Sequence, residues 1–234
     1  MTRHVHVLIF TWLLTALASC SSASRAPAPL ADHAMGGPRV PGACEARASA
    51  NVGKLGCYFD VAVDIGTVSG AVFWHVNEFP DAPSAEGVKG ASSAVVHAYG
   101  RTFLETVNGD AQWRPSGGWH LATVGPMQAP QGEPVTVRFM QAMTEPDAMT
   151  RPHRHSGPEA FYVLSGSICL ETPAGARTVD AGETLQAAAM VPMQLTSAGG
   201  GLRRSLFVVI HPSSQPWMTT APDWMPKGAC GRQL

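Results

Sequence analysis

Two histidines and a glutamate in this chain stand at a spacing that suits a metal site. A single residue separates His153 from His155, and Glu159 follows four residues after the second histidine. Alternate side chains of a β-strand point to the same face, so the two imidazoles are expected to project together. The Ser156–Pro158 segment then turns the chain, and Glu159 opens an apolar run that predicts a second strand. Two imidazoles and a carboxylate that meet across neighbouring strands can bind a divalent ion such as Fe, Mn or Zn.

Short apolar runs broken by glycine and proline predict the elements that position these side chains. No long stretch keeps the roughly 3.6-residue period of an amphipathic helix, and one short helix is expected at Ser84–Lys89, capped by Ser84. The Asn-Gly pair within Val107–Asp110 predicts a hairpin turn. The run Leu206–Ile210 is apolar throughout, which is typical of a strand buried on both faces. We therefore predict an all-β protein whose sheet closes into a barrel. The expected strands are Tyr58–Val63, Val68–Val76, Ala94–His97, Phe103–Val107, His120–Val124, Val135–Met143, Ala160–Leu164, Ile168–Glu171, Thr184–Gln186 and Leu206–Ile210.

The histidine-glutamate spacing resembles the first motif of the cupin superfamily. That motif has His-x-His, a glutamate four residues on and a glycine seven residues after the glutamate, and His153, His155, Glu159 and Gly166 match it position for position. The family motif also carries a glycine six residues before the first histidine, where this chain has Asp147. The resemblance implies that the two histidines and Glu159 are metal ligands.

A second stretch resembles the second cupin motif, which supplies a third histidine. It begins at Gly182, and the Pro-x-Gly turn of the family reads Ala188–Met190 in this chain. The histidine eleven residues after the first glycine falls on Met193, or on Gln194 if one residue is inserted. Met193 and Gln194 are therefore the alternative candidates for a fourth ligand. A thioether prefers softer ions such as Cu(I), whereas a carboxamide oxygen suits Mn, Fe or Zn.

The resemblance also implies the domain organisation. It covers roughly residues 133–212, which are expected to form the double-stranded β-helix of the cupin fold, a jelly-roll-like barrel. Residues 44–132 are interpreted as extra N-terminal strands and loops packed onto that barrel, with a decayed first cupin half as the alternative. Residues 44–230 would then form a single cupin domain.

Two functional hypotheses follow from this resemblance. The first is a metal-dependent cupin enzyme of the oxygenase, isomerase or decarboxylase type that acts on a small polar molecule. Glu159 would then be a third ligand or the catalytic proton-transferring base, in an interior lined by Phe161 and Val163. The second is a non-catalytic protein that binds or senses a small ligand in the same barrel without bound metal. Many cupins associate through their outer strands, so the family also suggests a homodimer.

The N-terminus has the pattern of an export signal. The apolar core Val7–Leu17 is too short to span a bilayer, so residues 1–19 are interpreted as a signal peptide. Leu17–Cys20 resembles the lipobox of bacterial lipoproteins, which implies lipidation of Cys20. The alternative is ordinary cleavage near Ala18 that leaves a secreted soluble protein. Residues 20–43 are rich in Ser, Ala, Pro and Gly and predict a flexible tether. The expected location is the bacterial cell envelope, lipid-anchored to the membrane or periplasmic.

Composition and cysteine content agree with a small exported domain. The chain is 45% hydrophobic and 14% charged with a formal net charge of −1, which argues against a polyanion-binding surface and against nucleic acid as a partner. Apart from Cys20 there are four cysteines, Cys44, Cys57, Cys169 and Cys230, and an oxidising compartment would allow two disulfides. Three pairings are open. Cys44 and Cys230 flank the domain, and Cys169 could equally be a buried free thiol.

Overall fold

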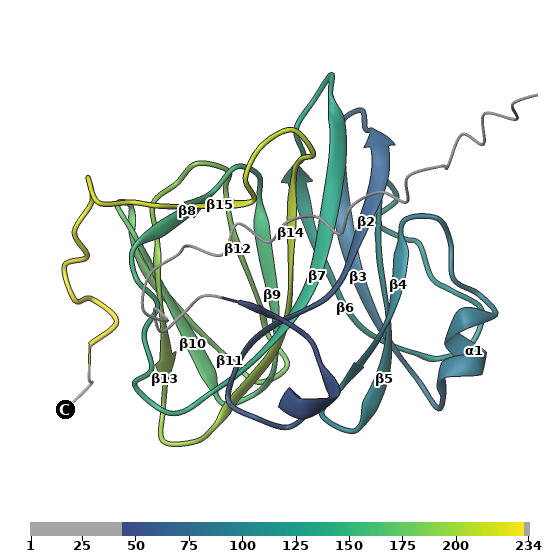
Figure 1. The fold of residues 1–234 in the computed structure, drawn as a ribbon, viewed down its shortest axis with the longest axis horizontal. Helices are drawn as coiled ribbons and strands as arrows, with labels where there is room; N and C mark the ends of the chain where they lie inside the picture. Colours follow the sequence, from purple (N-terminus) through teal and green to yellow (C-terminus); the bar gives the residue numbers. More distant parts are fainter. Residues whose placement is uncertain (1–43, 232–234) are drawn as a thin grey trace, which may run out of the picture. The chain divides into compact units, whose positions relative to one another are not determined.

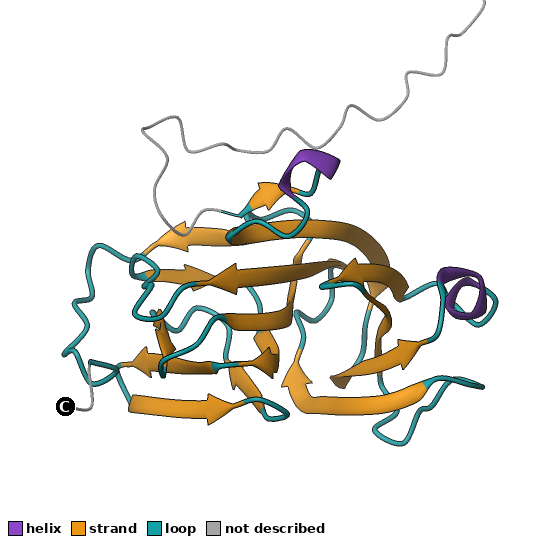
Figure 2. Ribbon diagram, turned by 90° about the horizontal axis from the view of Figure 1, so that it is seen from below, coloured by secondary structure: helices purple, strands orange, loops and turns teal. Residues whose placement is uncertain are grey.

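Strands make up nearly all of the regular structure. The structure is a computed structural model, and it describes residues 44–231 of the 234-residue chain. Within residues 44–231 only two short helices interrupt the strands. Figure 2 shows the predominance of strands, which confirms the all-β prediction. The predicted signal peptide, Cys20 and the whole predicted tether lie outside the described residues. Within the described residues no helix has the length and apolar character that a bilayer crossing requires.

The strands of the described part of the chain form four sheets. Figure 1 labels most of these strands. The largest has the order β1 (Glu45–Ala46), β2 (Gly56–Thr67), β7 (Pro134–Thr144), β14 (Arg203–Pro212), β9 (Glu159–Ser165) and β12 (Thr184–Ala187). A second has the order β11 (Gly175–Asp180), β10 (Ser167–Thr172) and β13 (Gln194–Ala198). The third is the pair β15 (Met218–Thr220) and β8 (His153–His155). The fourth, N-terminal sheet has the order β4 (Ser93–Ala98), β5 (Arg101–Asn108), β3 (Ala71–Phe79) and β6 (Trp119–Gln128). The helices are η1 (Ser49–Asn51) and α1 (Ala82–Glu86).

The six-stranded sheet is buried on both faces. In β14, Leu206 and Val208 contribute to a core shared with the N-terminal sheet, whereas Phe207 and Val209 contribute to a core shared with the β11-β10-β13 sheet. This alternation confirms that Leu206–Ile210 is a strand covered on both sides. The second core is the interior of a jelly-roll-like barrel, and the predicted lining residues Phe161 and Val163 belong to it.

The segments on either side of residues 133–212 also contribute strands to the barrel. The β2 strand, from the N-terminal extension, pairs with β7 along most of its length. The β15 strand, beyond residue 212, pairs with β8. The strands β3 to β6 instead form their own sheet against the outer face of the barrel, as expected for added N-terminal strands.

Two local predictions in the N-terminal part are wrong. The helix α1 begins earlier than Ser84–Lys89, because the side chain of Asp81 accepts a hydrogen bond from the Ser84 backbone N–H and acts as the cap. The Val107–Asp110 segment makes no tight hairpin, since β5 and β6 both pair with β3 and not with each other. The Asn108 side chain accepts the Asp110 backbone N–H and directs the chain into a longer loop.

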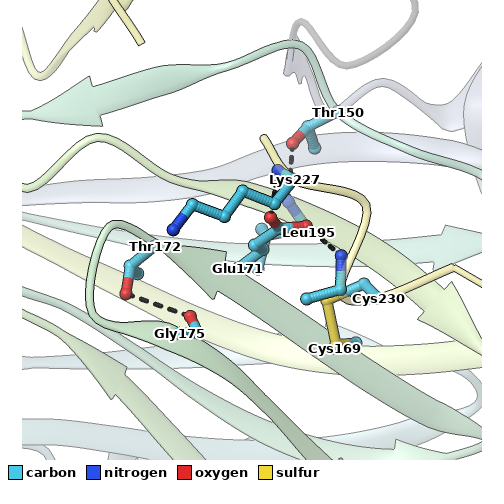
Figure 3. Close-up of a disulfide and its surroundings, with 9 residues drawn as sticks. Thr150, Cys169, Glu171, Thr172, Gly175, Leu195, Lys227 and Cys230 are labelled. Carbon is cyan, nitrogen blue, oxygen red and sulfur yellow. Dashed lines mark hydrogen bonds between the residues drawn. A yellow bond between two sulfur atoms is a disulfide. The ribbon is translucent and has the colours of Figure 1, made fainter. Parts of the chain in front are cut away.

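Two disulfides settle the cysteine pairing. They join Cys44 to Cys57 and Cys169 to Cys230, so Cys44 and Cys230 do not tie the ends together and Cys169 is not a free thiol. Figure 3 shows the second bridge fixing the C-terminal segment, residues 213–231, against β10. Beside it the buried Glu171 carboxylate accepts the backbone N–H groups of residues 227 and 229. The C-terminal segment is therefore attached both covalently and by charge-assisted hydrogen bonds.

The glycine positions of the cupin motifs keep a left-handed backbone even where the glycine is missing. Gly166 and Gly182 have φ of 70° and 88°. Asp147 and Met190, which replace two motif glycines, both have φ of 62°. Non-glycine residues adopt this conformation at a cost of about 1–2 kcal/mol, so the surrounding fold imposes it. Met190 therefore keeps the backbone conformation of the motif glycine that it replaces, which is consistent with an alignment that has no insertion before residue 190.

A buried acid at the edge of the barrel sheet predicts a pH-dependent stability. Asp60 lies in a β-bulge of β2, and its side chain is 8% exposed. Burial raises the pKa of Asp60 from 3.8 to about 7, although the hydrogen bond from Gln141 and the charge of Arg47 oppose the rise. Between these two pH values the folded protein holds a proton that the unfolded chain releases, so stability falls as the pH rises.

We expect Asp60→Asn to remove this dependence, because an amide keeps the acceptor for Gln141 and carries no charge. At pH 8 the variant should exceed the wild type in unfolding free energy by up to roughly 4 kcal/mol, and the difference should vanish near pH 4. Urea unfolding at both pH values measures this. Equal slopes against pH for the two proteins would contradict it.

Candidate metal centre

The three predicted ligands meet inside the barrel. The two histidines are the ends of β8, and Glu159 begins β9. His153, His155 and Glu159 are 7%, 1% and 2% exposed, and one ligating atom from each lies within 4.8 Å of the others. Among the described residues, no other group of histidine, cysteine and acidic side chains comes together in this way.

A close backbone approach explains the turn between the ligands. A Cβ atom on Gly157 would lie 1.7 Å from the carbonyl oxygen of Ile210, so only glycine fits there. Ile210 also donates its backbone N–H to the carbonyl oxygen of Pro158. The turn is thereby tied to β14 at the point where the chain enters β9, and this contact fixes where Glu159 begins.

The backbone sets the orientation and the tautomer of both imidazoles. His153 Nδ1 lies 2.7 Å from the carbonyl oxygen of Arg151, and His155 Nδ1 lies 3.0 Å from that of Trp217. A carbonyl oxygen can only accept, so each Nδ1 carries a proton and donates it. When the ring is neutral, this tautomer presents the lone pair of Nε2, which is the form that binds a metal.

Two buried polar atoms of the cluster have no hydrogen-bond partner, and its charges shift the pKa values of both histidines. His155 Nε2 lies 3.4 Å from Glu159 Oε1, and neither His155 Nε2 nor Glu159 Oε2 has a hydrogen-bond partner. Burial lowers the pKa of His155, but the charge of Glu159 and the hydrogen bond to the Trp217 carbonyl oxygen outweigh it and raise that pKa overall. Burial and the neighbouring His155 lower the pKa of His153. Buried polar atoms without partners are costly, and a divalent ion would satisfy both of them. The residues therefore fit a metal.

The two candidates for a fourth ligand point in different directions. Met193 is fully buried in the barrel core, and its backbone exchanges both hydrogen bonds with His153. Residues paired in this way project their side chains to the same face. Gln194 faces the other way, and its side-chain amide donates to the carbonyl oxygen of Thr150.

The C-terminal segment supplies contacts that the motif search missed. The ring of Trp217 stacks on His155 at 5.2 Å between centroids and meets Phe59 edge-on at 5.1 Å. Arg154, between the two histidines, points away from them as alternation predicts, and its guanidinium pairs with Asp223 at 2.7 Å. Trp217 lies C-terminal to both motifs, and no sequence spacing relates it to the histidines. The sequence alone therefore did not indicate its contact with His155.

Comparison with known proteins gives matches to solved structures only. No family model and no curated protein matches the chain. A cupin superfamily protein from Desulfitobacterium hafniense aligns at 12% identity over 35% of this chain and 71% of its own, with a TM-score of 0.29. The Cupin_2 domain of an XRE family transcriptional regulator from Enterobacter cloacae aligns at 18% identity over 32% of this chain and 80% of its own, with a TM-score of 0.29.

An oxalate oxidase in complex with the substrate analogue glycolate also aligns, at 18% identity and a TM-score of 0.31. That alignment covers 38% of this chain and 46% of the oxidase. The alignment thus spans less than half of the oxidase's own length.

Proposed function

We propose that this chain is an exported cupin-type protein that holds a divalent metal inside its barrel and acts on or binds a small polar molecule. The observation that carries the proposal is the cluster of His153, His155 and Glu159, whose ligating atoms lie within 4.8 Å. Both imidazoles are already held with Nε2 free to bind, and two of the buried atoms lack partners. Such a site would take Fe, Mn or Zn.

The chain's own residues define what the site can do. A bound ion would supply Lewis-acid or redox chemistry at an open coordination position. Glu159 is positioned to hold the ion or to exchange a proton with a bound molecule. The apolar side chains of Phe161 and Val163 exclude water from the interior. These features suit an oxygenase, an isomerase or a decarboxylase, and the fold alone does not select among them.

A second candidate function is ligand binding without metal or catalysis. Two observations favour it: the 3.4 Å pair of His155 and Glu159, which can balance its charges without an ion, and the apolar Met193 in place of a third histidine. Elemental analysis of protein purified from its native compartment decides between the two. Near-stoichiometric Fe, Mn or Zn, lost on chelation and restored on reloading, supports the metal site. If the metal content is only a trace and does not rise on reloading, the metal site is refuted and ligand binding without metal is the remaining candidate.

We propose further that Cys20 is lipidated and anchors the mature protein in the cell envelope. The support is the sequence Leu17–Cys20 followed by a Ser, Ala, Pro and Gly-rich tether. The wild type should fractionate with membranes, because lipidation of an N-terminal cysteine supplies more than one acyl chain. Cys20→Ala should abolish that association, and mass spectrometry of the N-terminus should show no lipid. Wild-type protein found soluble in the periplasm with an unmodified N-terminus would refute the anchor.

A further inference from the structure

A buried arginine shares the barrel interior with the metal centre. Arg203 is the first residue of β14 and is 5% exposed. It lies two residues before Ser205 and four before Phe207, so all three project to the interior face. Ser205 pairs with Ala142 on β7 and with Val163 on β9, and both belong to the core inside the barrel. The side chain of Ser205 therefore faces the barrel interior.

Arg203 is only partly satisfied by the protein. Its Nε donates to Thr144 Oγ1 at 3.0 Å, and that hydroxyl lies 2.5 Å from Ser197 Oγ. Its Nη1 is buried without a hydrogen-bond partner, and no carboxylate of residues 44–231 lies within ion-pair distance. Burial lowers the pKa of Arg203 to about 10, opposed by Tyr99 and Glu159, so the guanidinium remains charged at neutral pH.

With a divalent ion bound at the metal centre, positive charge in the interior would exceed negative charge. Of the buried acids in the described part of the chain, only Glu159 belongs to the barrel interior. Asp60 accepts from Gln141, which shares the outer face of the sheet with Leu206. Glu105 faces the same outer core and accepts from the Trp74 indole, and Glu171 is capped by the C-terminal segment. Glu159 already lies beside His155. A divalent ion at the metal centre would add two more positive charges, and buried charge without compensation is strongly unfavourable.

A second unpartnered atom belongs to the residue two positions along the same face of β14. Ser205 is fully buried, and its Oγ has no hydrogen-bond partner. Two positions along one face of a strand are separated by about 7 Å, so a bound group can reach both Ser205 Oγ and the extended Arg203 side chain. A guanidinium presents N–H donors in a planar fork that matches a carboxylate.

We propose that the barrel interior binds a small carboxylate anion, held by the guanidinium of Arg203 and the hydroxyl of Ser205. Its assignment as the molecule on which the metal centre acts rests on the proposed function. The anion must be small, because stacked Phe161 and Phe207 fill the interior, with 5.2 Å between ring centroids.

The test is titration of the purified protein with acetate and malonate, followed by calorimetry and by the thermal unfolding midpoint at constant pH and ionic strength. Acetamide is the neutral control ligand of the same shape, and chloride is the control anion. The wild type should bind a carboxylate saturably and acetamide not at all. Arg203→Met should weaken binding more than tenfold, and Ser205→Ala should weaken it less.

Arg204→Met is the matched control variant, because Arg204 is the next residue on β14 and projects to the opposite face. It should bind as the wild type does. Absence of saturable carboxylate binding, equal binding by Arg203→Met, or equal stabilisation by chloride would each overturn the proposal. If Arg203→Met does not fold, Ser205→Ala against the wild type decides.

Metal content measured on the same preparations separates this inference from the proposed function. If metal-loaded protein does not bind carboxylates, the anion site is refuted and the metal site is still supported. Carboxylate binding that depends on Arg203 in protein unable to take up metal would support the anion site and refute the metal function.

Discussion

Replacing His153 and His155 together by alanine should leave the purified protein without bound metal under conditions in which the wild type is loaded. One ligating atom of each imidazole lies within 4.8 Å of the other and of Glu159, and Met193 supplies no comparable donor for a hard ion. Loss of a group that only orients a ligand costs about 10–100-fold in metal affinity. Loss of two ligands should exceed that range. Zinc or manganese titration followed by elemental analysis measures the change.

Arg154→Ala is the matched control, because it changes the residue between the two histidines on the face that does not meet the cluster. Its guanidinium pairs with Asp223, and the variant should keep its metal. Glu159→Gln tests the third position. A ligand role predicts a large loss of affinity, whereas a role only as a base predicts near-normal metal and loss of turnover. Stoichiometric metal in the double histidine variant would place the site elsewhere.

The parts of the site that the sequence could predict are those governed by local geometry. Strand alternation alone places His153 and His155 on one face and Arg154 on the other. Alternation also divides β14 between two cores, and it would have revealed Arg203 as an interior cation had the strand been extended to residue 203. The left-handed turn at Met190 follows from the motif, because the backbone of the turn persists after the glycine is replaced.

The parts that the sequence could not predict depend on how distant segments close over the barrel. The carbonyl that orients His155 belongs to Trp217, 62 residues further along the chain. The partner of Cys169 is Cys230, across a separation of 61 residues, and four cysteines allow three pairings. The Asn108-Gly109 turn failed for a related reason, since β5 pairs with β4 and β3 on its two sides and leaves no edge for β6.

Met193→His should raise the affinity for zinc or manganese by roughly tenfold to a hundredfold. This gain is similar in size to the loss of metal affinity that follows when a residue hydrogen-bonded to a metal ligand is removed. Met193 lies directly opposite His153, with backbone hydrogen bonds of 3.0 and 2.8 Å in the two directions. The Cα atoms of such a pair are about 5.5 Å apart, so a new imidazole would face the existing ones. Without metal the same ring is a polar group in an apolar core, and the metal-free variant should be less stable than the wild type.

Gln194→His is the control, because the Gln194 side chain leaves the barrel and bonds the carbonyl oxygen of Thr150. The metal affinity of the Gln194→His variant should equal that of the wild type. Met193→Leu removes the thioether without adding a donor and should also leave affinity unchanged, which separates the gain of an imidazole from the loss of sulfur. Metal titration of the three variants, with thermal unfolding in the presence and absence of metal, completes the experiment. If Gln194→His alone binds tighter, the second motif is shifted by one residue. If none does, position 193 does not reach the ion, and His153, His155 and Glu159 have no fourth ligand at position 193 or 194.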